Sequence, residues 1–123
     1  MPHKIRVNRE HKLIHVILSG KMSIDVALQL TTDAARLANK HGFKRILFDI
    51  RKFETHPTIT QIFDMAATAE KRGLKREYKR ATVISKEAQS QDFHFFEDVS
   101  VNRGYNVASF TDIDKAIEWL TTG

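Results

Sequence analysis

The sequence predicts a single α/β domain with a mostly parallel sheet, and three observations carry this prediction. Short apolar segments of strand type alternate with segments that carry apolar residues at helical spacing. Three of the five glycines, Gly42, Gly73 and Gly104, fall where a predicted helix ends. The 123 residues, 41% of them hydrophobic, suffice for one domain over residues 1–123 and leave no room for a second.

The predicted order of elements is ββαβαβαβα, and it opens with a hairpin. Ile5 and Val7 alternate with polar residues, and the β-rich run 13–18 follows a polar turn. Ser23 is a typical N-cap for the first helix. After this hairpin, repeated strand–helix–strand units imply right-handed crossovers. We therefore expect parallel strands covered by helices, with the first strand as an antiparallel edge.

The apolar run 46–50 predicts the central strand, because a strand covered on both faces is apolar almost throughout. The loop 51–57 follows it, and Pro57 disfavours helical dihedrals at the preceding residue. Thr58 and Gln61 then have the spacing of a capping box, which predicts that the second helix begins at Thr58. Ligands and partners gather beyond the carboxyl ends of strands in open α/β sheets, so this loop is the first candidate site.

The second half of the chain continues the same alternation. A core strand is expected at 81–84, a third helix from residue 90 to Gly104, a strand at 105–110 and a closing helix that buries residues 113–120 on one side. We find no internal repeat, linker or low-complexity segment.

The formal net charge of +5 is concentrated in one stretch, which we call the basic segment, residues 70–80. Its basic residues are Lys71, Arg72, Lys75, Arg76, Lys79 and Arg80, against Glu70 and Glu77. Such a segment could bind an acidic protein, anionic lipid or nucleic acid, and the alternative is a solvated helix end and loop. Nucleic acid is disfavoured, because only Tyr78 lies among the charges to stack on a base.

Several classes of function lack support in the sequence. The absence of cysteine excludes disulfides, thiolate metal sites and a cysteine nucleophile, and it is compatible with a reducing cytosol. No apolar run approaches the roughly 20 residues of a membrane span, and the N-terminus lacks the apolar core of a signal peptide. We therefore expect a soluble cytoplasmic protein.

Catalytic and metal-binding patterns are also missing. No nucleophile elbow, P-loop or dinucleotide-binding glycine motif occurs, so we predict no enzyme, no catalytic residue and no cofactor. His94, Glu97 and Asp98 have helical spacing, but a metal site needs further converging ligands, and we predict none. His15, within a predicted strand, is interpreted as structural.

The third helix is rich in phenylalanine. Phe93, Phe95 and Phe96 surround one turn, which is too many for a single buried stripe. They could line a pocket for an apolar small molecule, cover a neighbouring helix or a second subunit, or pack in the core.

The chain also resembles a known family. The resemblance rests on the strand–loop–helix from Phe48 to Thr58, on the segments 95–107 and 110–120, and most specifically on Val101-Asn102-Arg103-Gly104. These features resemble the small stand-alone bacterial STAS-like (SpoIIAA-like) proteins, which are relatives of anti-sigma-factor antagonists and are also grouped with lipid-binding Sec14-like domains. The resemblance covers essentially the whole chain.

This resemblance implies a STAS-type fold and a non-enzymatic protein-interaction module with a regulatory role. In the classical antagonists a partner kinase phosphorylates a Ser or Thr at the start of the second helix, and Thr58 stands at that place. Here Ile59-Thr60-Gln61 replaces the serine-glycine-leucine-glycine type of turn found in those proteins. The alternative for Thr58 is a plain N-cap. The expected partner surface comprises Phe53, Thr55, His56, Thr58, Gln61, Lys75 and Arg76. The Sec14-like grouping instead suggests an apolar or lipid-like ligand on the third helix.

Overall fold

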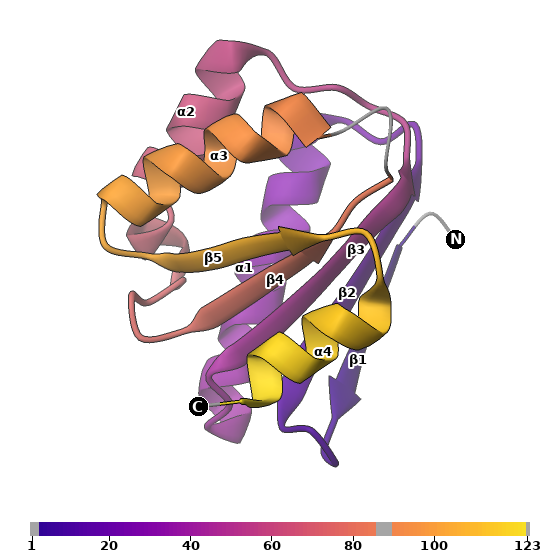
Figure 1. The fold of residues 1–123 in the computed structure, drawn as a ribbon, viewed down its shortest axis with the longest axis vertical. Helices are drawn as coiled ribbons and strands as arrows, with labels where there is room; N and C mark the ends of the chain where they lie inside the picture. Colours follow the sequence, from indigo (N-terminus) through magenta and orange to yellow (C-terminus); the bar gives the residue numbers. More distant parts are fainter. Residues whose placement is uncertain (1–2, 86–89, 123) are drawn as a thin grey trace.

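The computed structural model describes residues 3–85 and 90–122, which form one five-stranded mixed sheet with helices on both faces (Figure 1). The strands are β1 (His3–Asn8), β2 (Leu13–Gly20), β3 (Arg45–Phe53), β4 (Lys79–Val83) and β5 (Asn106–Phe110). The helices are α1 (Ile24–His41), α2 (Ile59–Ala67), α3 (Ser90–Asn102) and α4 (Ile113–Thr121), with a short 3-10 helix, η1 (Glu70–Arg72).

The strands lie side by side in chain order, β1-β2-β3-β4-β5. β1 pairs with β2 in antiparallel orientation, and each later pair is parallel. This confirms the predicted α/β class and the mostly parallel sheet with an antiparallel edge strand.

Each face of the sheet has its own hydrophobic core. Ile46 and Phe48 on β3 belong to the larger core, which they share with residues of α1, α2 and α3. Leu47, between them, points to the opposite face because side chains alternate along a strand. There it joins the smaller core with Ala116 and Leu120 of α4. One face therefore carries three helices and the other carries one.

Local end signals place the helices as predicted. The Ser23 hydroxyl accepts a hydrogen bond from the Val26 amide at the start of α1 (3.2 Å). A glycine follows each of three helices: Gly42 after α1, Gly73 after η1 and Gly104 after α3. Their φ angles are +70°, +89° and +89°. These left-handed conformations end the helices, as expected for glycine.

Two boundaries differ from the prediction. β3 continues to Phe53, because its ladder with β2 extends to the pair Gly20 and Phe53, so the predicted loop over 51–57 begins too early. The predicted second helix is also interrupted, since α2 ends at Ala67 and a separate turn, η1, leads to Gly73. At the break, the Thr68 hydroxyl donates to the Asp64 carbonyl (2.7 Å).

Candidate functional site

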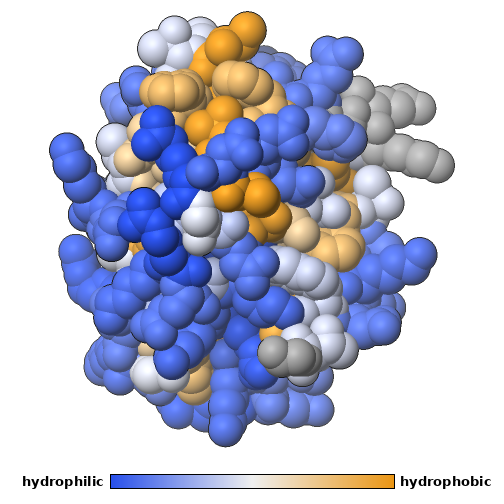
Figure 2. Space-filling view, turned by 60° about the vertical axis from the view of Figure 1, so that its left-hand side comes forward, coloured by the Kyte–Doolittle hydropathy of each residue, from blue (hydrophilic) through white to orange (hydrophobic). Residues whose placement is uncertain are grey.

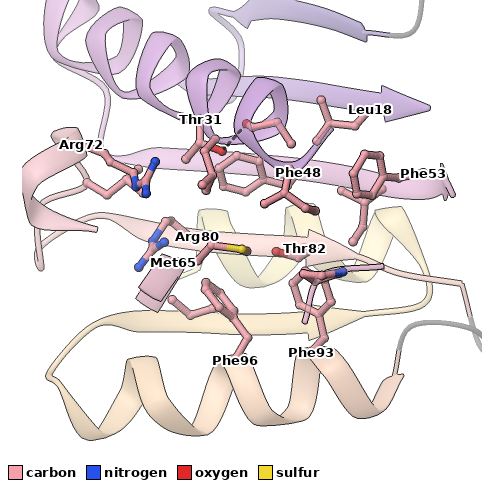
Figure 3. Close-up of a pocket in the computed structure, with 17 residues that line it drawn as sticks. Leu18, Thr31, Phe48, Phe53, Met65, Arg72, Arg80, Thr82, Phe93 and Phe96 are labelled. Atoms are coloured by element: carbon pink, nitrogen blue, oxygen red, sulfur yellow. Dashed lines mark hydrogen bonds between the residues drawn. The ribbon is translucent and has the colours of Figure 1, made fainter. Parts of the chain in front are cut away.

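A cavity of about 100 Å³ lies between the sheet and the three helices on its larger face (Figure 3). Phe48 and Ile50 of β3 and Thr82 of β4 contribute to its floor. Its walls include side chains of α1, α2 and α3, and Phe53 and Pro57 line it near the loop after β3. The lining is largely apolar.

The packing of the helices accounts for this space. α2 packs mainly against α3 rather than on the strands. Across from them, Ala27 and Thr31 of α1 line the cavity with short side chains. The Thr31 hydroxyl is also turned to its own helix, where it donates to the Ala27 carbonyl (3.1 Å). The interior between α1 and α3 is therefore incompletely filled.

One end of the cavity is cationic. Arg80 and Arg72 reach the same end, and Phe53 and Phe93 lie toward the other (Figure 3). Arg72 is half-buried, and its Nε donates to the Thr68 hydroxyl (3.2 Å). No acidic residue is among the described residues that line this cavity.

Arg80 is only 4% exposed, which is rare for a charged side chain. Its guanidinium lies over the Tyr105 ring, 5.2 Å from the centroid, and 6.0 Å from the centroid of Phe96. Nε and Nη2 are both buried and have no hydrogen-bond partner among the described residues. Burial lowers the pKa of Arg80 to about 10, so the group remains charged at neutral pH.

The phenylalanines of α3 separate into two groups. Phe93 and Phe96 line the cavity and contact each other edge to face, with ring centroids 5.6 Å apart. Phe95 does not line it and is 38% exposed. Successive helical residues are turned by about 100°, so Phe95 faces away when Phe96 faces inward. Of the three phenylalanines predicted to line a pocket, Phe93 and Phe96 do so and Phe95 does not.

The predicted loop residues lie together at the end of β3. The Thr55 hydroxyl donates to the Met22 carbonyl (2.6 Å), which ties the loop to the segment before α1. His56 Nδ1 lies 3.8 Å from the Asp92 carboxylate on α3. Thr58 forms the predicted capping box. Its hydroxyl accepts from the Gln61 amide (3.1 Å), and the Gln61 side chain accepts from the Thr58 amide (2.8 Å).

Lys75 and Arg76 do not join this loop. They precede β4, whose first residue pairs with the first residue of β3, so they lie at the opposite end of the sheet from Phe53. Arg76 also has internal partners, since it pairs with Glu70 and its Nε donates to the Arg103 carbonyl (2.9 Å). The predicted partner set therefore does not form one surface.

The basic segment as a whole is dispersed. Lys79 Nζ donates to the carbonyls of Trp119 (2.6 Å) and Thr122 (2.9 Å) at the end of α4, a favourable place for a cation. Arg80, its neighbour on β4, points to the other face of the sheet. Lys71 and Lys75 are exposed. Such a distribution does not present one continuous basic face to a nucleic acid.

A second charged cluster lies on the α4 face of the sheet. Arg51 donates through Nε and Nη2 to the two carboxylate oxygens of Asp49 (2.9 and 2.7 Å). Burial raises the pKa of Asp49, but these hydrogen bonds outweigh it, so the pKa is lowered overall. Burial also lowers the pKa of His15, against the attraction of Asp49. The ion pair lies within β3, and none of these three residues lines the cavity.

The burial of Arg80 was not predicted from the sequence. Arg80 was counted as one charge of the basic segment, because the strand was expected to begin at residue 81, whereas β4 begins at Lys79. With the correct start, the alternation of strand side chains places Arg80 and Thr82 on the same face. That alternation was the signal available in the sequence.

Comparison with known proteins adds no identity. No protein-family model matches the chain, and a search of curated proteins finds no match either. No helix within the described residues is long and apolar enough to cross a membrane.

Proposed function

We propose that this domain binds a small, mainly apolar molecule in the cavity beneath α1, α2 and α3. The observation that carries the proposal is a largely apolar cavity of about 100 Å³, lined both by the sheet and by the helices that cover its larger face. An apolar cavity of roughly 150 Å³ takes up benzene, whereas pockets for drug-sized ligands measure about 300–1,000 Å³. A small compound is therefore favoured over a whole membrane lipid.

Methionine methyl groups offer a direct test. Met65 lines the cavity, whereas Met22 is buried elsewhere in the core and serves as an internal reference. In a protein labelled with ¹³C at the methionine methyl groups, titration with benzyl alcohol should shift the Met65 signal saturably and leave Met22 nearly unchanged.

A cavity-filling variant provides the control. Ala27→Leu adds volume to the lining and should abolish the Met65 shift. Val26→Leu adds a methylene to the exposed side of α1 and should leave the shift intact. Equal shifts of Met65 and Met22, or an undiminished response of Ala27→Leu, would contradict the proposal.

A second candidate is a cytoplasmic, STAS-like interaction module for a protein partner such as a kinase or another regulatory factor. It is supported by Ile59 and Phe63, which lie one turn apart on α2 and are 73% and 44% exposed. Figure 2 views the molecule from the side on which α2 and α3 lie. Hydrophobic side chains gather in the upper half of this view, where Figure 1 places these two helices. Exposed apolar side chains of this kind are typical of interaction sites.

In this candidate, Thr58 is the regulatory position, since it is exposed at the helix start beside Ile59. A phosphate there would meet the free amides of the first turn and change the surface seen by a partner. A phosphopeptide map of protein from its own cells should contain phosphorylated Thr58, and Thr58→Glu should change partner binding while Thr58→Ser preserves it. A Thr58 peptide that is always unmodified would count against this candidate.

A further inference from the structure

Arg80 is buried without an ion-pair partner among the described residues, unlike Arg76 and Arg51. Arg76 is paired with Glu70, and Arg51 with Asp49. Arg80 is more deeply buried than either, yet it belongs to none of the ion pairs among the described residues. Two aromatic rings cover its guanidinium, and its Nε and Nη2 hydrogens are unused by the described residues. Burying a charge without a partner is unfavourable, so a bound molecule that supplies an acceptor to these two nitrogens would be favoured.

Arg51 shows which chemical group binds the Nε and Nη2 side of a guanidinium in this protein. Its Nε and Nη2 bind both oxygens of the Asp49 carboxylate, one hydrogen bond to each oxygen. In Arg80 the same two nitrogens are buried and have no partner among the described residues, so a ligand reaches them by displacing the side chains that cover them. Two parallel N–H groups match the two oxygens of a carboxylate in spacing as well as in charge.

The surroundings of Arg80 define the rest of the ligand. Apart from the two arginines and two threonines, the lining consists of apolar side chains, including Met65, Phe93 and Phe96 (Figure 3). Arg72 adds a second positive charge at the same end. A molecule that matches both parts carries one negative head and an uncharged apolar body.

We infer that Arg80 anchors the carboxylate of a small carboxylic acid whose apolar body, an aromatic ring or a short aliphatic chain, fills the remainder of the cavity. This inference rests on the proposed ligand-binding function and adds the chemical class of the ligand. The buried guanidinium selects acids over neutral compounds of the same shape, and the apolar lining excludes strongly polar anions.

The test compares benzoate with benzyl alcohol, which share a ring and differ in the charged head. Affinities are measured from the Met65 methyl shift in the native protein, in Arg80→Met and in Lys75→Met. Lys75→Met removes one positive charge from the same basic segment, at an exposed position that does not line the cavity. Arg80→Lys keeps the charge but lacks the paired N–H edge.

Native protein and Lys75→Met should bind benzoate at least about tenfold more tightly than benzyl alcohol, the effect of one charge-assisted hydrogen bond. Arg80→Met should retain benzyl alcohol and lose the preference, and Arg80→Lys should lose most of it. Equal affinity of native protein for the two probes, or an unchanged preference in both Arg80 variants, would overturn the inference and leave the proposed cavity function standing. Failure of both probes to shift Met65 would overturn the proposed function, and the inference with it.

Discussion

At Arg80 the chain keeps a guanidinium in its interior between two aromatic rings. Cation–π contacts with Tyr105 and Phe96 offset part of the free energy lost when the charge leaves water. They do not supply hydrogen-bond acceptors for Nε and Nη2. A residue retained at a cost in stability is typical of a functional site, where binding requires a group that folding alone would not favour.

The first prediction concerns this cost. Arg80→Met keeps an unbranched apolar stem and removes a buried charge that has no ion-pair partner among the described residues, so the free energy of unfolding should rise by about 1–3 kcal/mol. Urea denaturation measures the change. Arg51→Met is the matched comparison and should have the opposite sign. It leaves the buried Asp49 carboxylate without its partner, and the expected loss is about 1–2 kcal/mol because Arg51 itself is partly exposed. An Arg80→Met protein less stable than the native one would contradict this assignment.

The second prediction concerns pH and His15. Burial lowers its folded-state pKa below the ordinary 6.5, against the attraction of Asp49 and together with repulsion from Arg6 and Arg51. The neutral form is therefore favoured in the folded protein, and its contribution to stability is complete above pH 6.5. That contribution should be lost as the pH falls from 6.5 toward the folded-state pKa.

Urea denaturation across this pH range, compared between native protein and His15→Gln, isolates the effect. The native protein should lose stability faster than the variant as the pH falls below 6.5. Asp49 acts in a separate window, because its lowered pKa makes its contribution complete above 3.8 and lost at lower pH. Parallel curves for the two proteins below pH 6.5 would show that His15 is not linked to folding.

At the scale of elements, α2 depends strongly on its first turn. It is nine residues long, and helices this short gain little from propensity alone. Its N-terminus is held by both hydrogen bonds of the capping box between Thr58 and Gln61. Because α2 packs mainly against α3, this cap helps hold the helix that covers the cavity.

The third prediction follows from this cap. Thr58→Ala should lower the free energy of unfolding by about 1 kcal/mol, because the Gln61 amide loses its acceptor. Thr58→Ser retains the hydroxyl and should remain within a few tenths of a kcal/mol of the native protein. Chemical denaturation of the three proteins gives these values. Equal stability of Thr58→Ala and Thr58→Ser would mean that the cap has no energetic role.

Local signals explain which elements could be predicted from the sequence. The apolar run of β3, the caps at Ser23 and Thr58 and the glycines after helices act within a few residues of chain, so their pattern was sufficient. The extension of β3 to Phe53 depends on pairing with β2, more than 30 residues earlier in the chain. The interruption of α2 after Ala67 has no strong sequence signal, since neither proline nor glycine marks it.

At the scale of the whole molecule, the two faces of the sheet differ in packing. On the α4 face, Leu47, Ala81 and Val83 are fully buried beneath one helix. On the other face, α2 packs mainly against α3, and a cavity remains over β3 and β4. The aromatic residues Phe93 and Phe96 could be predicted as candidates for this site. The burial of Arg80 was not predicted: strand alternation indicates its face of the sheet, but its burial depends on Tyr105 and on Phe96 of α3, which lie far from it in the chain.

A crystal structure of the protein with benzoate tests the central claim most directly. The account predicts the carboxylate within about 2.7–2.9 Å of Nε and Nη2 of Arg80, with the ring against Phe93 and Phe96. Benzoate bound on the outer surface alone, with the cavity unchanged and Arg80 without contact to it, would contradict the account.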